Sequence, residues 1–391
     1  MKQIYLDNGA TTPVRCEVLE EMTPYFAEDF GNASSVHGRG QRAHRAMEDA
    51  REKMASLLGA SPNEIIFTSG GTESDNLAIK GVAAARGRAG RIITSSVEHR
   101  AVLATCAALE KQGYEVIRLP VDRFGLVAPA DLHEALSAHR GETVLVTIMM
   151  ANNEVGTIEP IKELAAVAAE ASVPFHTDAV QAIGKVPVNV DELGVDLLSV
   201  SAHKFYGPKG VGALYVRAGT RIAPLQHGGH HENGRRAGTE NVPGIVGIAC
   251  AMELACAEVG EEAERLRQLR DRLQQGLLEE IEDSRVNGHP VQRLPHILNI
   301  TIPNAEGEAM LLRLDAVGVA ASSGSACTSG TLEPSHVLAA MGIPPETAHG
   351  SLRFSLGRMS TTDDMDYVME KLPPIVENLR AMSPFSKELR S

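Results

Sequence analysis

The sequence has no tryptophan, and aromatic residues make up only 4% of its 391 residues. A chain of this length buries a large core, so aliphatic side chains and methionine must supply most of that core. Its five cysteines are odd in number and include no C-x-x-C pair, which argues against both a disulfide framework and a zinc–cysteine site. We therefore expect a reducing compartment, the cytoplasm.

Basic residues are in the minority, with 37 Lys and Arg against 50 Asp and Glu, which gives a net charge of −13. Nucleic acids and anionic membranes bind basic surfaces, so neither is expected as a partner. The sequence also predicts no signal-peptide core and no apolar run of about 18 residues that could span a membrane.

Short apolar runs alternate with Ala-rich segments of helical spacing between about residues 40 and 260. The runs predict strands at 64–67, 91–94, 144–150, 173–177, 197–201 and 212–216. A segment such as 161–171 predicts an intervening helix. Alternation of this kind predicts an α/β fold with a mainly parallel sheet.

The composition of the chain changes after residue 260. Residues 261–281 are highly charged but carry leucines on one helical face, and a strand at 296–302 and a helix at 307–316 follow. A loop of small residues at 320–331 precedes a last helical stretch. We expect a large domain at 16–259 and a smaller α/β domain, built from 1–15 and 260–391, that carries this loop.

Lys204 directly follows a predicted strand and has small and turn-forming neighbours, which makes it ill placed for packing. It is either a solvent-facing loop lysine or an amine that forms a Schiff base with an aldehyde cofactor. Asp178 ends an earlier predicted strand, and either caps a helix or pairs with the ring nitrogen of pyridoxal phosphate. The nearby Gln181, within reach of a ring hydroxyl, favours the cofactor.

Residues 67–73 lead from a predicted strand through two glycines into a predicted helix. Glycines allow backbone N–H groups to approach a phosphate, and a helix N-terminus supplies positive potential. The pattern is common in other turns, and it is neither the dinucleotide fingerprint nor a P-loop. The pattern indicates a phosphate site only in combination with Lys204 and Asp178.

In this order the motifs resemble those of the cysteine desulfurases of the NifS/IscS-like group, within the class V aminotransferase-like (fold type I) pyridoxal-phosphate enzymes. The resemblance covers nearly the whole chain, through residues 5–13, 31–37, 68–73, 98–99, 152–156, 178–181, 201–204, 228–239, 323–327 and 353–358. Gly9 stands where alanine is commoner, and Ala33 where proline is common. The resemblance implies the fold type I architecture, with the cofactor in the large domain.

The resemblance also implies a role for each matching residue. Catalytic roles fall to Lys204, to His99, which would stack on the ring, and to Cys327 as sulfur acceptor. Arg353 and Asn153 would bind the substrate. The implied contacts to pyridoxal 5′-phosphate are Gly71, Thr72, His99, Asn153, Asp178, Gln181, Ser201, His203, Lys204 and Thr239, the last reaching in from the second subunit of a homodimer. No metal is expected, because nothing completes a ligand set for the neighbouring histidines at 230–231.

The implied reaction converts L-cysteine to L-alanine and leaves a persulfide on Cys327, which supplies an iron–sulfur scaffold or a thiolation acceptor. A selenocysteine lyase would share this chemistry, and an aminotransferase or another pyridoxal-phosphate lyase would share Lys204 and Asp178. A non-enzymatic scaffold for sulfur transfer would tolerate the loss of both residues.

Cys327 differs from the other cysteines in its surroundings. Cys106, Cys250 and Cys256 lie in Ala-rich helical stretches and suit packing, while Cys16 has no assigned role. Cys327 lies among Ser, Gly, Ala and Thr, with no Lys or Arg between 320 and 331 to lower the pKa of its thiol. Activation must therefore come from the pocket or from His336.

Overall fold

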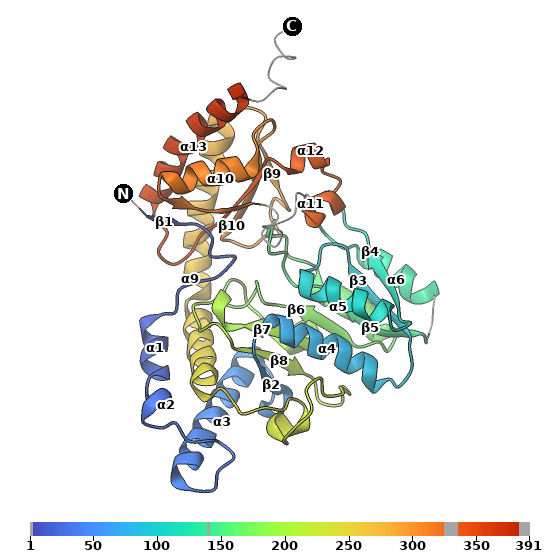
Figure 1. Ribbon diagram of the computed structural model, residues 1–391. Coiled ribbons are helices and arrows are strands. Elements are labelled where there is room, and N and C mark those ends of the chain that lie inside the picture. The colour runs from blue at the N-terminus through green and yellow to red at the C-terminus, as the bar shows by residue number, and fades with distance from the viewer. Residues whose placement is uncertain (1–2, 139–140, 324–334, 383–391) are drawn as a thin grey trace.

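The computed structural model describes residues 3–138, 141–323 and 335–382, so Cys327 lies outside the described residues. The chain forms a seven-stranded sheet with helices on both faces and a smaller four-stranded sheet, and the long helix α9 (Val242–Glu280) runs beside both (Figure 1). The N-terminal strand lies with the C-terminal elements in the smaller part.

The large sheet has the strand order β2-β8-β7-β6-β5-β3-β4. Its strands are β2 (Ile65–Thr68), β3 (Arg91–Ser95), β4 (Glu115–Leu119), β5 (Thr143–Thr147), β6 (Phe175–Asp178), β7 (Leu197–Ser201) and β8 (Gly212–Val216). The ladder is parallel from β4 to β7, and β8 pairs antiparallel with both β7 and β2. The six predicted strands are present, whereas β4 was not predicted.

Side chains of the large sheet enter two different cores because successive residues of a strand point to opposite faces. On β2, Ile65 and Phe67 join one core, which α3 and α9 cover, and Ile66 joins the other, beneath α4 and α5. The flanking helices are α3 (Gly38–Leu58), α4 (Gly71–Ala85), α5 (Arg100–Glu110), α6 (Pro129–Ala138), α7 (Ile161–Glu170) and α8 (Val190–Leu193). Burial on both faces explains the continuous apolar runs in the sequence.

The smaller sheet is antiparallel, in the order β12-β13-β10-β9. Its elements are β9 (Arg285–Asn287), β10 (Ile297–Thr301), β12 (Ser322–Ser323) and β13 (Ser351–Ser355), with helices α10 (Gly307–Ala316) and α13 (Thr362–Met382). A third core lies here and includes Ile4 and Leu6 from the N-terminus, because β1 (Ile4–Tyr5) pairs with β11 (Val319–Ala320). A division into two domains near residue 260 falls inside α9, and it stays a proposal.

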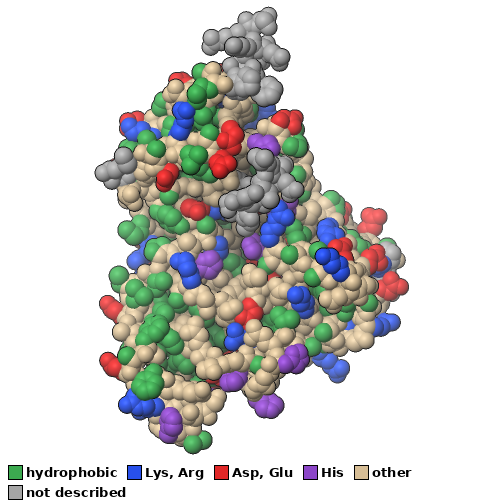
Figure 2. Space-filling model, viewed as in Figure 1, with side chains coloured by type: hydrophobic (Ala, Val, Ile, Leu, Met, Phe, Trp, Pro, Cys, Tyr) green, Lys and Arg blue, Asp and Glu red, His purple; other side chains and the backbone are tan. Residues whose placement is uncertain are grey.

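Short helices complete the described chain. They are α1 (Cys16–Met22), α2 (Pro24–Ala27), α11 (His336–Ala340) and α12 (Pro345–Ala348), with 3-10 turns η1 (Pro62–Glu64), η2 (Ala202–Lys204) and η3 (His231–Gly234). Acidic and basic side chains are interspersed over the face that Figure 2 shows.

Helix α9 is long and apolar enough to cross a membrane by length and composition, with a stretch of mean hydropathy 1.7 that is 44% buried. The prediction that no apolar run of this length occurs is therefore wrong. Within the described chain α9 packs against α1 and α3, and its Val242, Ile245 and Ile248 belong to the main core. Burial in that core accounts for the apolar composition of the N-terminal half of α9.

Candidate active site

A pocket of about 300 Å³ lies where β6 and β7 end, at the edge of the sheet where open α/β folds bind ligands. Its lining residues come from most of the length of the chain and include nearly every predicted site residue. They are Gly9, Ala10, Gly71, Thr72, Asp75, His99, Met149, Asn153, Asp178, Val180, Gln181, Ser201, His203, Lys204 and Arg353.

Lys204 reaches this pocket from η2, which begins directly after β7. Its Nζ donates to the carbonyl oxygens of Gly9 (2.7 Å) and Ala10 (2.8 Å). Gln181 Nε2 donates to the same Gly9 oxygen at 3.0 Å. The N-terminal segment thus holds the two predicted site residues in place, a contribution that the sequence analysis missed although it recognised the motif at 5–13.

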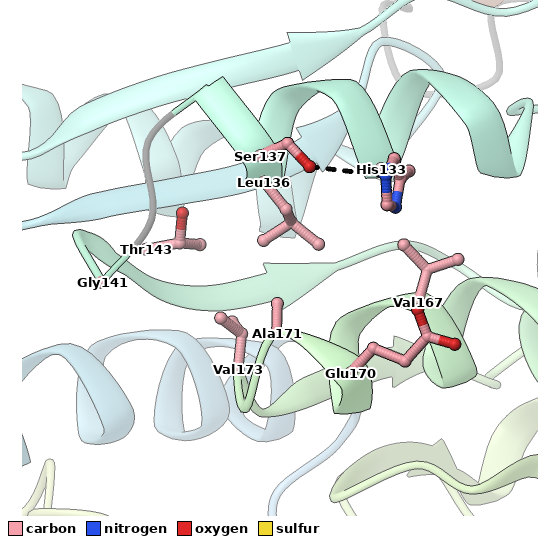
Figure 3. Close-up of a pocket in the computed structure, with 9 residues that line it drawn as sticks. All are labelled: His133, Leu136, Ser137, Gly141, Thr143, Val167, Glu170, Ala171 and Val173. Carbon is pink, nitrogen blue, oxygen red and sulfur yellow. Dashed lines mark hydrogen bonds between the residues drawn. The ribbon is translucent and has the colours of Figure 1, made fainter.

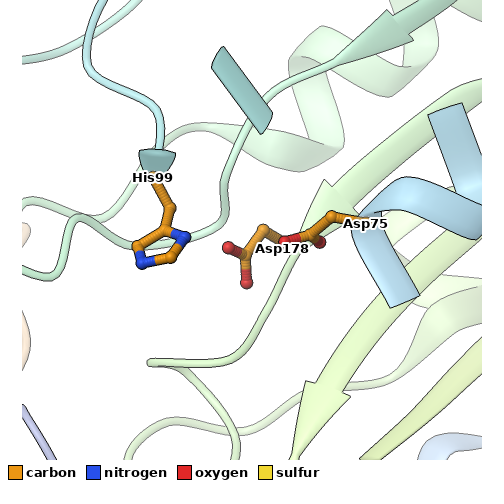
Figure 4. A group of neighbouring side chains, drawn as sticks. All are labelled: Asp75, His99 and Asp178. Carbon is orange, nitrogen blue, oxygen red and sulfur yellow. The ribbon is translucent and has the colours of Figure 1, made fainter. Parts of the chain in front are cut away.

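Asp178 is the last residue of β6 and is only 5% exposed. Its Oδ1 accepts a hydrogen bond from the backbone N–H of Val180 at 2.9 Å. Burial raises the pKa of Asp178, while His99 and Lys204 oppose that shift. Atoms of Asp75, His99 and Asp178 all lie within 4.8 Å of one another (Figure 4), and the sequence analysis did not assign Asp75 to the site.

His99 stands at the N-cap of α5, and its Nδ1 accepts the backbone N–H of Ala101 at 3.1 Å. This bond requires a lone pair on Nδ1, so the neutral ring carries its proton on Nε2. Burial lowers the pKa of His99, and Lys204 and Arg100 lower it further against the influence of Asp178. His99 therefore presents a neutral imidazole to the pocket.

The phosphate end of the predicted site forms where β2 leads into α4. Gly70 has φ +149°, which only glycine adopts without strain, and a Cβ on Gly71 would lie 2.8 Å from Val180 Cγ2. Ser201 and His203 line the same pocket. Burial and the nearby Lys204 lower the pKa of His203 to about 4, so its ring is neutral.

Arg353 comes from β13 in the smaller part of the molecule and is 1% exposed. Its Nη1 donates to the backbone carbonyl of Asn153 and its Nη2 to Asp7 Oδ1, each at 2.8 Å. The buried Nε has no hydrogen-bond partner among the described residues. The guanidinium therefore keeps one donor available in a pocket that also contains Lys204.

These features fit pyridoxal phosphate. Lys204 offers an amine for the aldehyde, Asp178 a carboxyl group for the ring nitrogen, and the start of α4 positive potential for the phosphate. A Cβ at Gly71 would fill part of the space proposed for the phosphate. The buried Nε of Arg353, which has no hydrogen-bond partner among the described residues, suits an anionic group.

Two predicted residues do not line the pocket of this chain. Thr239 lines another hollow, together with Phe67 and Gly238, and Cys327 lies outside the described residues. Among the other cysteines, Cys106 is buried and its pKa is raised to about 12, Cys250 and Cys256 are half-buried, and Cys16 is exposed.

A further hollow lies between α6 and α7 (Figure 3). His133 and Ser137 approach to 3.4 Å at its edge, and Val167 and Glu170 face them across it. No lysine or arginine is among the described residues that line this hollow. It offers neither the amine nor the phosphate cradle of the first pocket.

Comparison with known proteins gives consistent matches. Residues 4–368 match the aminotransferase class-V family. Cysteine desulfurase IscS of Methanosarcina thermophila is 58% identical over 392 residues, which cover 100% of this chain and 96% of that protein. A solved structure of a NifS-like protein is 42% identical with TM-score 0.90, covering 96% of this chain and 100% of that one. SspA in complex with cysteine is 39% identical with TM-score 0.81, covering 90% and 99%.

Proposed function

The chain belongs to the aminotransferase class-V family, among its cysteine desulfurases, and we propose that it desulfurates L-cysteine with the residues of the pocket around Lys204. The overall reaction converts L-cysteine to L-alanine and transfers the sulfur to an enzyme cysteine. The convergence of Lys204, Asp178 and Arg353 on one pocket carries the proposal, because these residues supply an amine, a carboxyl group and an anion-binding group within reach of one small substrate.

Pyridoxal 5′-phosphate is the proposed cofactor, and Lys204 is the residue whose amine would hold its aldehyde. When bound, it withdraws electrons from the α-carbon of the substrate. Asp178 would support that withdrawal by favouring the protonated ring nitrogen, and Gln181 and Asn153, which line the same pocket, would contact the ring hydroxyl. The first turn of α4, with Gly71 and Thr72, together with Ser201 and His203 would bind the phosphate.

Arg353 is proposed to bind the carboxylate of the substrate. Its unpartnered Nε and its Nη2, now on Asp7, form one edge of the guanidinium that suits a carboxylate. Asp7 is 23% exposed at its side chain, so it can return to water when the substrate takes its place. Asn153 stays bonded to Nη1 through its carbonyl and fixes the plane of the group.

Proton transfer at the substrate carbon and orientation of the substrate sulfur are assigned to two residues. The amine of Lys204 would take the α-proton of the substrate and later return a proton to the substrate carbon. His99 would donate a hydrogen bond to the substrate sulfur through Nε2–H, because its Nδ1 lone pair accepts the backbone N–H of Ala101. The neutral ring thus orients that sulfur, whose proton stays on the persulfide.

Cys327 is the proposed sulfur acceptor. Its thiolate attacks the substrate sulfur, an S–S bond forms as the C–S bond breaks, and the carbon product gains a proton to become alanine. The persulfide then passes to an iron–sulfur scaffold or a thiolation protein. A cytoplasmic location is part of the same proposal, since free thiols persist in reducing compartments.

A homodimer is the proposed active unit, with Thr239 of each subunit reaching the phosphate bound by the other. Two observations support it: Thr239 lines a hollow away from its own pocket, and α1, α2 and the segment after them expose Leu19, Phe26, Phe30 and Val36. Apolar side chains gather over α1 and α2 at the lower left of Figure 2. Exposed apolar groups of this size typically cover a partner.

One assay tests the proposed function. The protein is incubated with L-cysteine and a thiol reductant, and alanine and sulfide are measured together. Equal amounts of both products are expected. An aminotransferase would instead yield a keto acid, and a selenocysteine lyase would prefer selenocysteine over cysteine. Alanine without sulfur release, or neither product, would contradict the proposal.

A further inference from the structure

A second buried carboxyl group accompanies Asp178. Asp75 lies one turn into α4, is 1% exposed and lines the same pocket. Atoms of Asp75, Asp178 and His99 lie within 4.8 Å of one another (Figure 4). None of the roles proposed above uses Asp75.

Two carboxyl groups this close, away from water, cannot both ionise without a large cost, so the pair is expected to hold one proton. Asp178 is the better site for the charge, because its Oδ1 accepts a backbone N–H and both His99 and Lys204 lower its pKa. Asp75 Oδ1 has no donor among the described residues. Its neighbour Glu98 is another acid rather than a cation.

The basic group nearest to Asp75 does not neutralise it. His176 Nε2 lies 3.8 Å from Asp75 Oδ1, but the ring is fully buried and its pKa is lowered to about 3. That ring bonds Ser199 Oγ at 2.9 Å through Nε2 and Thr147 Oγ1 at 2.8 Å through Nδ1. Either tautomer of the neutral ring satisfies both hydroxyls. With its proton on Nδ1 the ring donates to Thr147 and accepts from Ser199, and Ser199 Oγ can then accept a hydrogen bond from Asp75.

We propose that Asp75 is a positioning residue, a neutral carboxylic acid hydrogen-bonded to Ser199 that leaves Asp178 as the single carboxylate facing the cofactor ring. This inference rests on the proposed function. Asp75 joins α4, whose N-terminus would bind the phosphate, to β6 and β7, which carry Asp178 and Lys204. A negative charge one turn from that N-terminus would weaken its attraction for phosphate.

Electrostatics agrees with this geometry. Burial and the nearby Asp178 raise the pKa of Asp75 well above its usual range, and Glu98 adds to the effect. Together they outweigh the lowering that a hydrogen bond from Ser199 to the charged carboxylate would bring. Glu159 is a useful reference, because it is also buried and its pKa is raised to about 8, yet it does not line the pocket. Its carboxyl group accepts the backbone N–H of Val127 instead.

The protonation state is tested by infrared spectroscopy of the full-length protein at neutral pH. Asp75→Asn should remove one carbonyl band of a protonated carboxylic acid, with an intensity equal to that removed by the reference variant Glu159→Gln. A band that persists in Asp75→Asn would overturn the assignment.

The positioning role is tested by cofactor affinity, followed through visible absorbance. Asp75→Ala should weaken binding roughly tenfold, since it removes a buried hydrogen bond and frees Ser199, and the neutral, isosteric Asp75→Asn should restore most of the affinity. Equal losses in both variants, or no loss in Asp75→Ala, would refute the role. Failure of the proposed function would appear elsewhere, as a Lys204→Ala variant that keeps a borohydride-reducible cofactor.

Discussion

Replacement of Arg353 by glutamine tests the proposed substrate site most directly. The side chain is 1% exposed, so its interaction with a substrate carboxylate would be desolvated and poorly screened. Loss of one partner of a buried, hydrogen-bonded charge pair costs about 2–5 kcal/mol. At about 1.4 kcal/mol for each factor of ten, kcat/KM for L-cysteine should fall by roughly 30-fold to several thousand-fold.

The loss should be smaller in Arg353→Lys, which keeps the charge but not the two parallel N–H donors. Steady-state alanine release at several cysteine concentrations measures both variants. Arg91→Gln is the matched control, because Arg91 is also buried and paired, with Glu115 and Glu142, at the far side of the large sheet. A folded Arg353→Gln variant with kcat/KM within about threefold of the wild type would refute the carboxylate role of Arg353.

Lys204→Ala should abolish the borohydride-reducible cofactor linkage seen by mass spectrometry, whereas Lys185→Met should keep it although Lys185 is also buried, with a pKa lowered to about 8. Cys327→Ala should stop alanine formation and the gain of one sulfur atom on its peptide, while Cys16→Ala, which removes an exposed thiol, should change neither. Burial raises the pKa of Glu154 to about 7, so its protonated form stabilises the fold at low pH and that contribution is lost as the pH rises from about 4.5 to about 7. Chemical denaturation should show that the free energy of unfolding of Glu154→Gln rises relative to that of the wild type across this pH window, by roughly 3 kcal/mol at most. A difference between the two proteins that does not change with pH would contradict the pKa shift of Glu154.

Local patterns in the sequence predicted the framework of the site. Lys204 and Asp178 each follow an apolar run, and the carboxyl ends of adjacent parallel strands meet at one edge of a sheet, so the sequence alone implies that the two side chains converge. The turn that leads into α4 could be recognised in the same way. Arg353 lies on an antiparallel strand of another sheet, and only the family resemblance connected it with the pocket.

The remaining parts depend on contacts that no local pattern encodes. Asp75 resembles any polar residue in the first turns of an amphipathic helix, and its burial beside Asp178 follows from how α4 packs on β6. The edge strand β4 is half exposed, so it lacks the continuous apolar run that revealed its neighbours. The change of charge near residue 260 predicted a break, but the helix continues through it and only its surroundings change.

The placement of the N-terminal segment has a consequence for biosynthesis. Strand β1 pairs with β11, and Asn8 bonds Ser355, a residue 347 positions later in the chain. The segment that contains β1 and Asn8 therefore leaves the ribosome long before β11 and Ser355 have been made, and it must remain without these partners until they are. The carbonyls of Gly9 and Ala10 that hold Lys204 arrive only with this last closure. A truncated nascent chain thus contains Lys204, the proposed cofactor lysine, but not the contacts that orient it, which ties the appearance of the proposed activity to the synthesis of the C-terminal part.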